Sequence, residues 1–261
     1  MKERIITALI AIAVFVPVVW YGGAVFTIAI YALASIGLFE LIRMKGLSLV
    51  SLPTMLTGLL LWLILIPSHV NLFSGLEINK VEITFIIVLL LLSYTVLSKN
   101  TFTFDDASFL LMTTIYVAMG FYYMNETRSS GLEYIFYAFF IIWATDTGAY
   151  FIGKAIGKRK LWPEISPNKT VEGSVGGILC AVVIALIYNA FVPISDHIFF
   201  LIAVTVAVSV FGQIGDLVES AFKRHYGVKD SGKILPGHGG ILDRFDSLLF
   251  VLPLLHFLHF I

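Results

Sequence analysis

Long apolar stretches separated by short polar segments occupy most of this 261-residue chain. A helix needs about 20 mostly apolar residues to cross the roughly 30 Å hydrocarbon core of a bilayer. Barrel strands would alternate apolar and polar residues, and such alternation is absent, so helices are expected to satisfy the backbone in lipid. The pattern predicts about nine membrane-spanning helices, over residues 5–21, 24–41, 50–67, 81–98, 107–124, 132–153, 171–192, 197–222 and 241–261.

Composition supports a membrane protein. Hydrophobic residues make up 59% of the chain and charged residues 13%, and the mean hydropathy is +0.94, well outside the range of soluble domains. Lys+Arg and Asp+Glu both number 17, so the charge balance predicts no nucleic-acid partner. We expect one all-α, polytopic domain over residues 1–261, surrounded by membrane lipid.

The basic residues are distributed unevenly between the two sides of this arrangement. If the N-terminus is cytoplasmic, all Lys and Arg residues except Lys80 and Arg128 fall on cytoplasmic segments, as the positive-inside rule requires. Two cytoplasmic loops, 154–170 and 223–240, are long, basic and rich in Gly and Pro. Function is expected on such loops, which places a site at the cytoplasmic face of the membrane.

Both loops lie in the second of two regions into which we divide the expected single domain. Residues 1–130 are predicted to form N-terminal helices with a lipid-contacting or packing role. Residues 131–261 are predicted to form the catalytic helices and their cytoplasmic loops.

The first candidate cluster joins the sixth predicted helix to the loop that follows it. Asp146 lies in an otherwise apolar helix, and ionisable groups at membrane depth are candidates for function. Lys169 and Thr170 precede the next helix start, where exposed N–H groups favour anions. The alternatives are a carboxylate satisfied by nearby Thr or Lys side chains, and basic residues that serve only to set topology.

The second cluster lies at the cytoplasmic end of the eighth predicted helix. Asp216, Glu219, Ser220 and Lys223 share one helix face, and Arg224 follows them. Two carboxylates, a hydroxyl and an ammonium on one face form half of a site for a divalent cation with a phosphate nearby. A solvated, amphipathic helix end is the alternative.

The third cluster combines glycines with carboxylates. Gly239 and Gly240 follow His238, and glycine lets a backbone approach a ligand closely. Asp243 and Asp246 lie three residues apart at the expected start of the ninth helix, where carboxylates complement the helix dipole. Helix capping alone would account for only one of these two carboxylates.

The ligand types in these clusters indicate a particular chemistry. Carboxylate oxygens accompanied by Lys and Arg, without a Cys/His metal set, favour Mg²⁺ and a phosphorylated substrate over zinc. A bound metal would neutralise phosphate charge while a P–O bond is exchanged. The predicted metal ligands are Asp216, Glu219, Asp243 and Asp246.

The same segments resemble a known family. From Ser220 to Asp246 the chain reads Ser-Ala-Phe-Lys-Arg, then Lys229-Asp-Ser-Gly, then Leu-Pro-Gly-His238-Gly-Gly-Ile-Leu-Asp243-Arg-Phe-Asp. This closely resembles the signature of phosphatidate cytidylyltransferases. The stretches Thr-Asp-Thr-Gly-Ala-Tyr-Phe and Ser-Pro-Asn-Lys-Thr-Val-Glu-Gly also look like that family's. The resemblance is strong over residues 140–250, whereas the first 130 residues match only in being hydrophobic.

The resemblance implies transfer of CMP from CTP to phosphatidate, which yields CDP-diacylglycerol and pyrophosphate. It implies Mg²⁺, with K⁺ as a candidate monovalent cation, and a homodimer. Asp216, Asp243, Asp246 and Lys223 would be catalytic. The substrate-binding residues would be Asp146, Lys169, Thr170, Ser220, Arg224, Lys229, His238, Gly239, Gly240 and Arg244.

Two other functions remain open at the level of sequence. A polyprenol or phytol kinase would also use CTP in a membrane but would release CDP instead of pyrophosphate. An ion-coupled transporter would place carboxylates near mid-membrane on several helices, whereas the second and third clusters here lie at helix ends.

Overall fold

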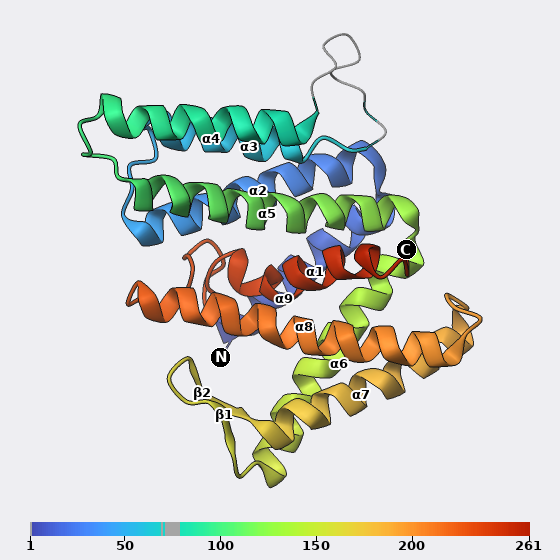
Figure 1. Cartoon of the computed structure of the whole chain (residues 1–261). Coiled ribbons are helices and arrows are strands. Elements are labelled where there is room, and N and C mark those ends of the chain that lie inside the picture. The colour runs from blue at the N-terminus through green and yellow to red at the C-terminus, as the bar shows by residue number, and fades with distance from the viewer. Residues whose placement is uncertain (1, 69, 71–78) are drawn as a thin grey trace.

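The computed structural model describes residues 2–68, 70 and 79–261, and the side chains of residues 2–5 and 8 are not among the described features. The described chain is predominantly helical, as predicted (Figure 1). In chain order the elements are α1 (Lys2–Tyr21), α2 (Gly23–Lys45), α3 (Leu52–Ile64), α4 (Lys80–Leu97), α5 (Phe104–Ser130), α6 (Leu132–Ile156), β1 (Lys160–Trp162), β2 (Ser166–Thr170), α7 (Val171–Phe191), α8 (Ile198–His225) and α9 (Leu242–Phe257).

The helices coincide with the nine predicted apolar stretches, but they differ in length. Among the described residues, six helices are long and apolar enough to cross a membrane, namely α2, α4, α5, α6, α7 and α8. Helix α3 has 13 residues and α9 has 16, or about 20 and 24 Å at 1.5 Å per residue. The apolar part of α1 is also short, at Leu9–Tyr21. The prediction of a multi-pass helical protein is therefore confirmed. Among the described residues, six helices are long enough to span a membrane.

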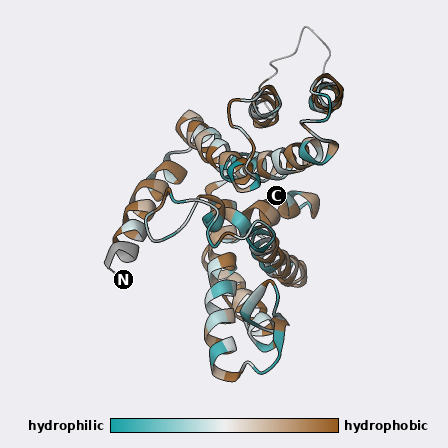
Figure 2. Ribbon diagram, turned by 90° about the vertical axis from the view of Figure 1, so that its left-hand side faces the viewer, coloured by the Kyte–Doolittle hydropathy of each residue, from teal (hydrophilic) through white to brown (hydrophobic). Residues whose placement is uncertain are grey.

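Successive helices run back and forth, so their connections alternate between two ends of the bundle. One end carries residues 46–51, 98–103, 157–170 and 226–241 (Figure 1), and we call it the site end. The other carries residues 131 and 192–197 and the C-terminus, and we call it the opposite end. Figure 2 looks onto the site end, with hydrophobic colouring along most of the helices and hydrophilic colouring at some helix ends and in the hairpin.

A small hairpin at the site end is an element that the apolar pattern did not predict. Strands β1 and β2 pair antiparallel, with Lys160 opposite Thr170 and Trp162 opposite Ser166. The segment was expected to be an irregular loop. Pro167 lies inside β2, which is tolerated because strands at a sheet edge can lack one ladder donor.

Helices α6 and α7 pack closely and carry this hairpin between them. A Cβ on Gly177 of α7 would come within 2.6 Å of the carbonyl oxygen of Thr145, and one on Gly173 would come equally close to the carbonyl oxygen of Ala149. Small residues let membrane helices approach this closely. The α6–α7 pair therefore holds the hairpin, which contacts α8 through Lys169 and Ile165.

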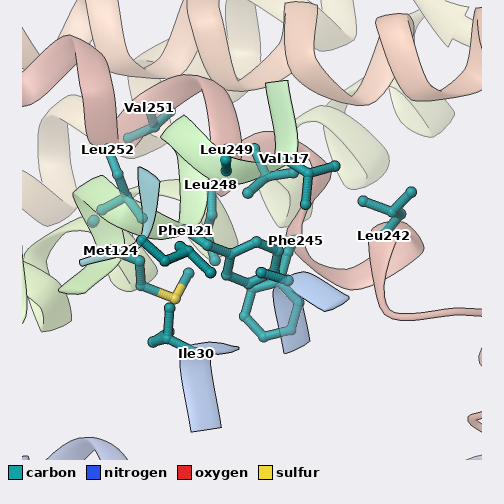
Figure 3. Packing of buried hydrophobic residues seen from close by; sticks show 14 of the residues in the cluster. Ile30, Val117, Phe121, Met124, Leu242, Phe245, Leu248, Leu249, Val251 and Leu252 are labelled. Atoms are coloured by element: carbon teal, nitrogen blue, oxygen red, sulfur yellow. The ribbon is translucent and has the colours of Figure 1, made fainter. Parts of the chain in front are cut away.

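The short helix α9 lies in the interior of the bundle. Figure 3 shows Phe245 and Leu249 of α9 packed with Phe121 of α5 and Ile30 of α2. None of these four side chains is more than 9% exposed. A Cβ on Gly120 of α5 would lie 2.9 Å from the Cα of Leu249, so the two backbones nearly touch. Because protein surrounds α9, its first turn is fixed by neighbouring helices.

The two basic residues predicted to lie away from the cytoplasm both cap helices at the opposite end. Lys80 Nζ donates to the carbonyl oxygens of Ile64 and Ile66, at 2.8 and 2.6 Å. Arg128 Nη2 donates to the carbonyl oxygen of Trp20 at 2.9 Å. Cations at helix C-termini stabilise unpaired carbonyl groups and the helix dipole. These two exceptions to the basic-residue pattern therefore have a structural role.

Candidate active site

The predicted charged face of α8 is present near its C-terminal end. Lys223 forms an ion pair with Glu219 one turn earlier, and the Ser220 hydroxyl lies 3.4 Å from Asp216 Oδ1. The Glu219 side chain is 1% exposed and that of Lys223 is 15% exposed. These charges are therefore largely removed from water, which contradicts the alternative of a fully solvated helix end.

Asp243 at the start of α9 meets this face. Its Oδ1 accepts a hydrogen bond from Lys223 Nζ at 2.7 Å. Its Oδ2 accepts three more, each at 2.8 Å, from Ser231 N, Ser231 Oγ and Gly240 N. A carboxylate with this many donors is held in one orientation and in its charged form. The second and third predicted clusters are thus one site, joined by Lys223.

The glycines before α9 leave room for carboxylates of the protein itself. Gly239 has φ +86°, a conformation that favours glycine, and a Cβ there would meet Asp243 Oδ2. A Cβ on Gly240 would collide with Glu40 Oε1 and with Ser231 Oγ. The Gly240 N–H already donates to Asp243. The close backbone approach expected from these glycines is therefore made to Glu40 and Asp243 in this structure.

Glu40 is a site-end residue that the sequence reasoning did not single out. It lies in α2, is 2% exposed, and accepts hydrogen bonds from Ile241 N and Leu242 N at 2.9 and 3.0 Å. The Ser231 hydroxyl, whose single proton is shared with Asp243 Oδ2, lies 3.1 Å from Glu40 Oε2. The sequence did carry a signal for Glu40, which is a carboxylate at the end of an apolar stretch. Such a carboxylate is costly unless it has partners.

The hairpin brings the first cluster to the same site. Lys169 of β2 forms an ion pair with Asp216 of α8, and their side chains are 26% and 31% exposed. Arg224 Nε donates to the carbonyl oxygen of Ile165 at 3.2 Å, which ties the end of α8 to the turn of the hairpin. Elements separated by about 50 residues therefore share one charged region.

Asp146, Asp216 and Asp246 lie on α6, α8 and α9, which pack against one another, and a Cβ on Gly215 of α8 would lie 2.7 Å from the carbonyl oxygen of Asp246. Among the residues that the structure describes, no group of three or more Asp, Glu, His or Cys side chains is already arranged around a metal position. The donor type and charge still suit Mg²⁺, because carboxylates outnumber the ammonium groups of Lys169 and Lys223 in the region.

Thr170 has a role within the fold. It is 8% exposed and occupies the N-cap position of α7, where its Oγ1 accepts a hydrogen bond from Gly173 N at 3.1 Å. A Thr at this position stabilises a helix start without any ligand. Glu172 accepts hydrogen bonds from the backbone N–H groups of Lys158 and Arg159, at 3.0 and 3.1 Å.

The remaining candidate residues have polar side-chain atoms without a hydrogen-bond partner among the described residues. Lys229 and Arg244 are exposed, and within the described part of the chain their side chains make no hydrogen bond or ion pair in this structure. His238 is half-buried, and its Nδ1 atom is buried without a hydrogen-bond partner among the described residues. These groups are free to face a ligand, unlike Thr170.

The whole chain is similar to known cytidylyltransferases. The model of the cytidylyltransferase family matches residues 2–261. A phosphatidate cytidylyltransferase of Bacillus subtilis (strain 168) is 58% identical over 261 residues, covering 99% of this chain and 97% of its own length. A phosphatidate cytidylyltransferase of Staphylococcus saprophyticus is 52% identical over 260 residues, covering 99% and 98%.

These similarities extend the resemblance well beyond residues 140–250, where the motifs carried it. The N-terminal helices, which the motifs left as merely hydrophobic, match along with the rest of the chain. With the charged residues of α2, α8, α9 and the hairpin gathered at one end of a membrane helix bundle, the chain belongs to the cytidylyltransferase family.

Proposed function

We propose that this chain is a phosphatidate cytidylyltransferase that converts CTP and phosphatidate into CDP-diacylglycerol and pyrophosphate. The observation that carries the proposal is the position of Lys223 between Glu219 of α8 and Asp243 of α9, at the site end of the bundle. A water-soluble nucleotide and a membrane-bound phosphate can meet only near such a surface. The names of the full-length relatives support the same reaction.

The reaction needs little proton transfer from the protein. A phosphate oxygen of phosphatidate, already ionised near neutral pH, attacks the α-phosphorus of CTP. A new P–O bond forms as the bond to the β-phosphate oxygen breaks, and pyrophosphate leaves with that electron pair. Positioning and charge neutralisation therefore carry most of the catalysis.

The basic residues at the site end would supply much of this neutralisation. Lys169 and Lys223 now neutralise carboxylates, and both can turn toward phosphate oxygens when a substrate binds. The exposed side chains of Arg224, Lys229 and Arg244 follow Lys223 in the sequence, between the end of α8 and the start of α9, and would hold outer phosphate groups. His238 would contribute its unpaired Nδ1 atom.

The carboxylates fit a divalent cation. Asp216 and Asp243 would hold Mg²⁺, with Asp246 and Glu219 as further ligands and K⁺ as a candidate second cation. In this structure Asp243 Oδ1 accepts a hydrogen bond from Lys223, so Lys223 would have to release this carboxylate, for example toward a phosphate, before it could hold a cation. When bound, Mg²⁺ would neutralise charge on the phosphates undergoing exchange.

The proposed orientation places the site end in the cytoplasm and the chain in the plasma membrane. It is supported by the basic residues at the site end and by the capping roles of Lys80 and Arg128 at the opposite end. A homodimer is part of the proposal on family resemblance alone. Labelling of introduced cysteines from each side of the membrane measures the orientation. Light scattering of the purified protein measures whether it is a dimer.

One assay tests the function. Purified full-length protein is incubated with CTP labelled in its cytidine, phosphatidate and Mg²⁺, and the products are separated. Label in a CDP-lipid with equimolar pyrophosphate supports the proposal, and a chelator should abolish both. Release of CDP with phosphorylation of a polyprenol or phytol would support the kinase instead. Absence of any CTP consumption by folded protein would contradict both enzymes and leave the transporter.

A further inference from the structure

Glu40 lies outside every segment that the functional assignments use, yet it reaches the centre of the site end. It comes from α2, about 200 residues before its partners at the start of α9. Its side chain is 2% exposed. A buried carboxylate is expensive unless donors compensate it, so the two backbone N–H groups that donate to Glu40, together with the nearby Ser231 hydroxyl, explain how it is tolerated.

The first turn of α9 depends on this side chain. Ile241 occupies the N-cap position with helical backbone angles, and no side-chain cap is present at that position. The N–H groups of Ile241 and Leu242 instead donate to Glu40, at 2.9 and 3.0 Å. A carboxylate at a helix N-terminus satisfies free donors and complements the dipole. Glu40 is thus a cap supplied by another helix.

Glu40 is also connected to Asp243. The Ser231 hydroxyl lies 3.1 Å from Glu40 Oε2 and 2.8 Å from Asp243 Oδ2. Glycines at 232 and 240 make this contact possible, because a Cβ at either position would collide with Glu40 Oε1. The loop before α9 is therefore closed around the Glu40 carboxylate on one side and the Asp243 carboxylate on the other.

We propose that Glu40 is a positioning residue for the cytidylyltransferase reaction. It fixes the loop 231–240 and the first turn of α9, so that Asp243 stays directed at Lys223. It touches neither substrate nor the reacting atoms. The inference rests on the proposed function for its kinetic consequence, whereas its structural consequence can be measured without turnover.

The kinetic test compares two Glu-to-Gln variants of the full-length protein. Glu40→Gln keeps the side-chain size but places an NH₂ group against backbone donors, so kcat should fall about 10- to 100-fold, with the KM for CTP within about threefold of wild type. Glu40→Asp, which keeps the charge, should recover part of the loss. Glu82→Gln is the matched control, because Glu82 accepts from Asn79 N at the start of α4, and its kcat should not change.

Unchanged kcat in Glu40→Gln would overturn the proposal. So would a loss that Glu40→Asp does not relieve, or a loss accounted for entirely by less folded protein in gel filtration. If Glu40→Gln does not fold, Ser231→Ala replaces it, since this change cuts the link from Glu40 to Asp243 without leaving a buried charge unpaired. A wild-type kcat in Ser231→Ala would then contradict the inference.

Hydrogen exchange provides the readout that does not depend on activity. Peptides covering residues 231–247 should exchange faster in Glu40→Gln than in wild type, while the same peptides in Glu82→Gln should match wild type. Equal exchange in Glu40→Gln and wild type would overturn the positioning role even if the enzyme is active. Faster exchange in a chain that never consumes CTP would support the positioning role and reject only the proposed function.

Discussion

The two ends of the helix bundle use their basic residues in different ways. At the opposite end, Lys80 donates to the backbone carbonyl oxygens of Ile64 and Ile66. At the site end, Lys223 pairs with the carboxylates of Glu219 and Asp243. The first arrangement completes helix ends, whereas the second gathers side chains of both charges in one place.

The difference has a physical consequence. A backbone carbonyl belongs to the fold, so a lysine that caps it has no better partner to seek. A lysine among excess carboxylates can exchange partners when a cation binds the carboxylates and a phosphate binds the lysine. Partly exposed pairs such as Lys169 and Asp216 are best placed for this exchange, because ligands can reach them. Substitutions at the two ends should therefore separate activity from stability.

The largest effect is expected at Asp243. Asp243→Asn keeps an acceptor for the Ser231 and Gly240 donors but loses the charge that faces Lys223. Turnover should fall by about 1,000-fold or more, on the scale of other electrostatic groups at reacting phosphates. CDP-diacylglycerol formation by the purified variant measures this, with gel filtration to establish that it is folded. Normal CTP-dependent activity would reject Asp243 as a catalytic carboxylate.

A smaller loss is expected at Lys169. Lys169→Gln should lower kcat/KM for CTP about 10- to 100-fold, because one phosphate-facing cation is removed from the site. The free energy of unfolding should change by less than about 1 kcal/mol, since a partly exposed ion pair contributes little. Lys160→Gln, in the partner strand of the same hairpin, is the control and should stay within about twofold of wild type. Equal losses in both variants would show that the hairpin's overall charge matters instead.

The smallest effect on activity is expected at Lys80. Lys80→Gln should leave turnover within about twofold of wild type while lowering the free energy of unfolding by about 1–2 kcal/mol, because the carbonyl oxygens of Ile64, at the end of α3, and Ile66, just beyond it, lose a charged donor. Thermal unfolding in detergent and the CDP-lipid assay measure the two quantities on one preparation. A turnover loss larger than that of Lys169→Gln would break the contrast between the two ends.

Much of the fold could be predicted from local pattern. The apolar stretches located every described helix. Bilayer thickness explains the length of six of them, whereas α3 and α9 are shorter than their predicted stretches. Spacing on a helix also placed Asp216, Glu219 and Lys223 on one face, and the structure has Lys223 paired with Glu219 there. The hairpin was not predicted, because both strands are short and β2 contains Pro167. A proline in a short polar segment is typical of a loop.

The site divides in the same way. The sequence by itself indicated a lipid environment, a helical fold, the kinds of side chain available for chemistry and the family signature. Each of these depends on composition or on neighbours along the chain. Only the tertiary structure decided that Asp243 faces Lys223, that Lys169 reaches Asp216, and that Gly240 makes room for Glu40. These contacts join segments from distant parts of the chain, and their existence depends on how helices pack, which no local pattern specifies.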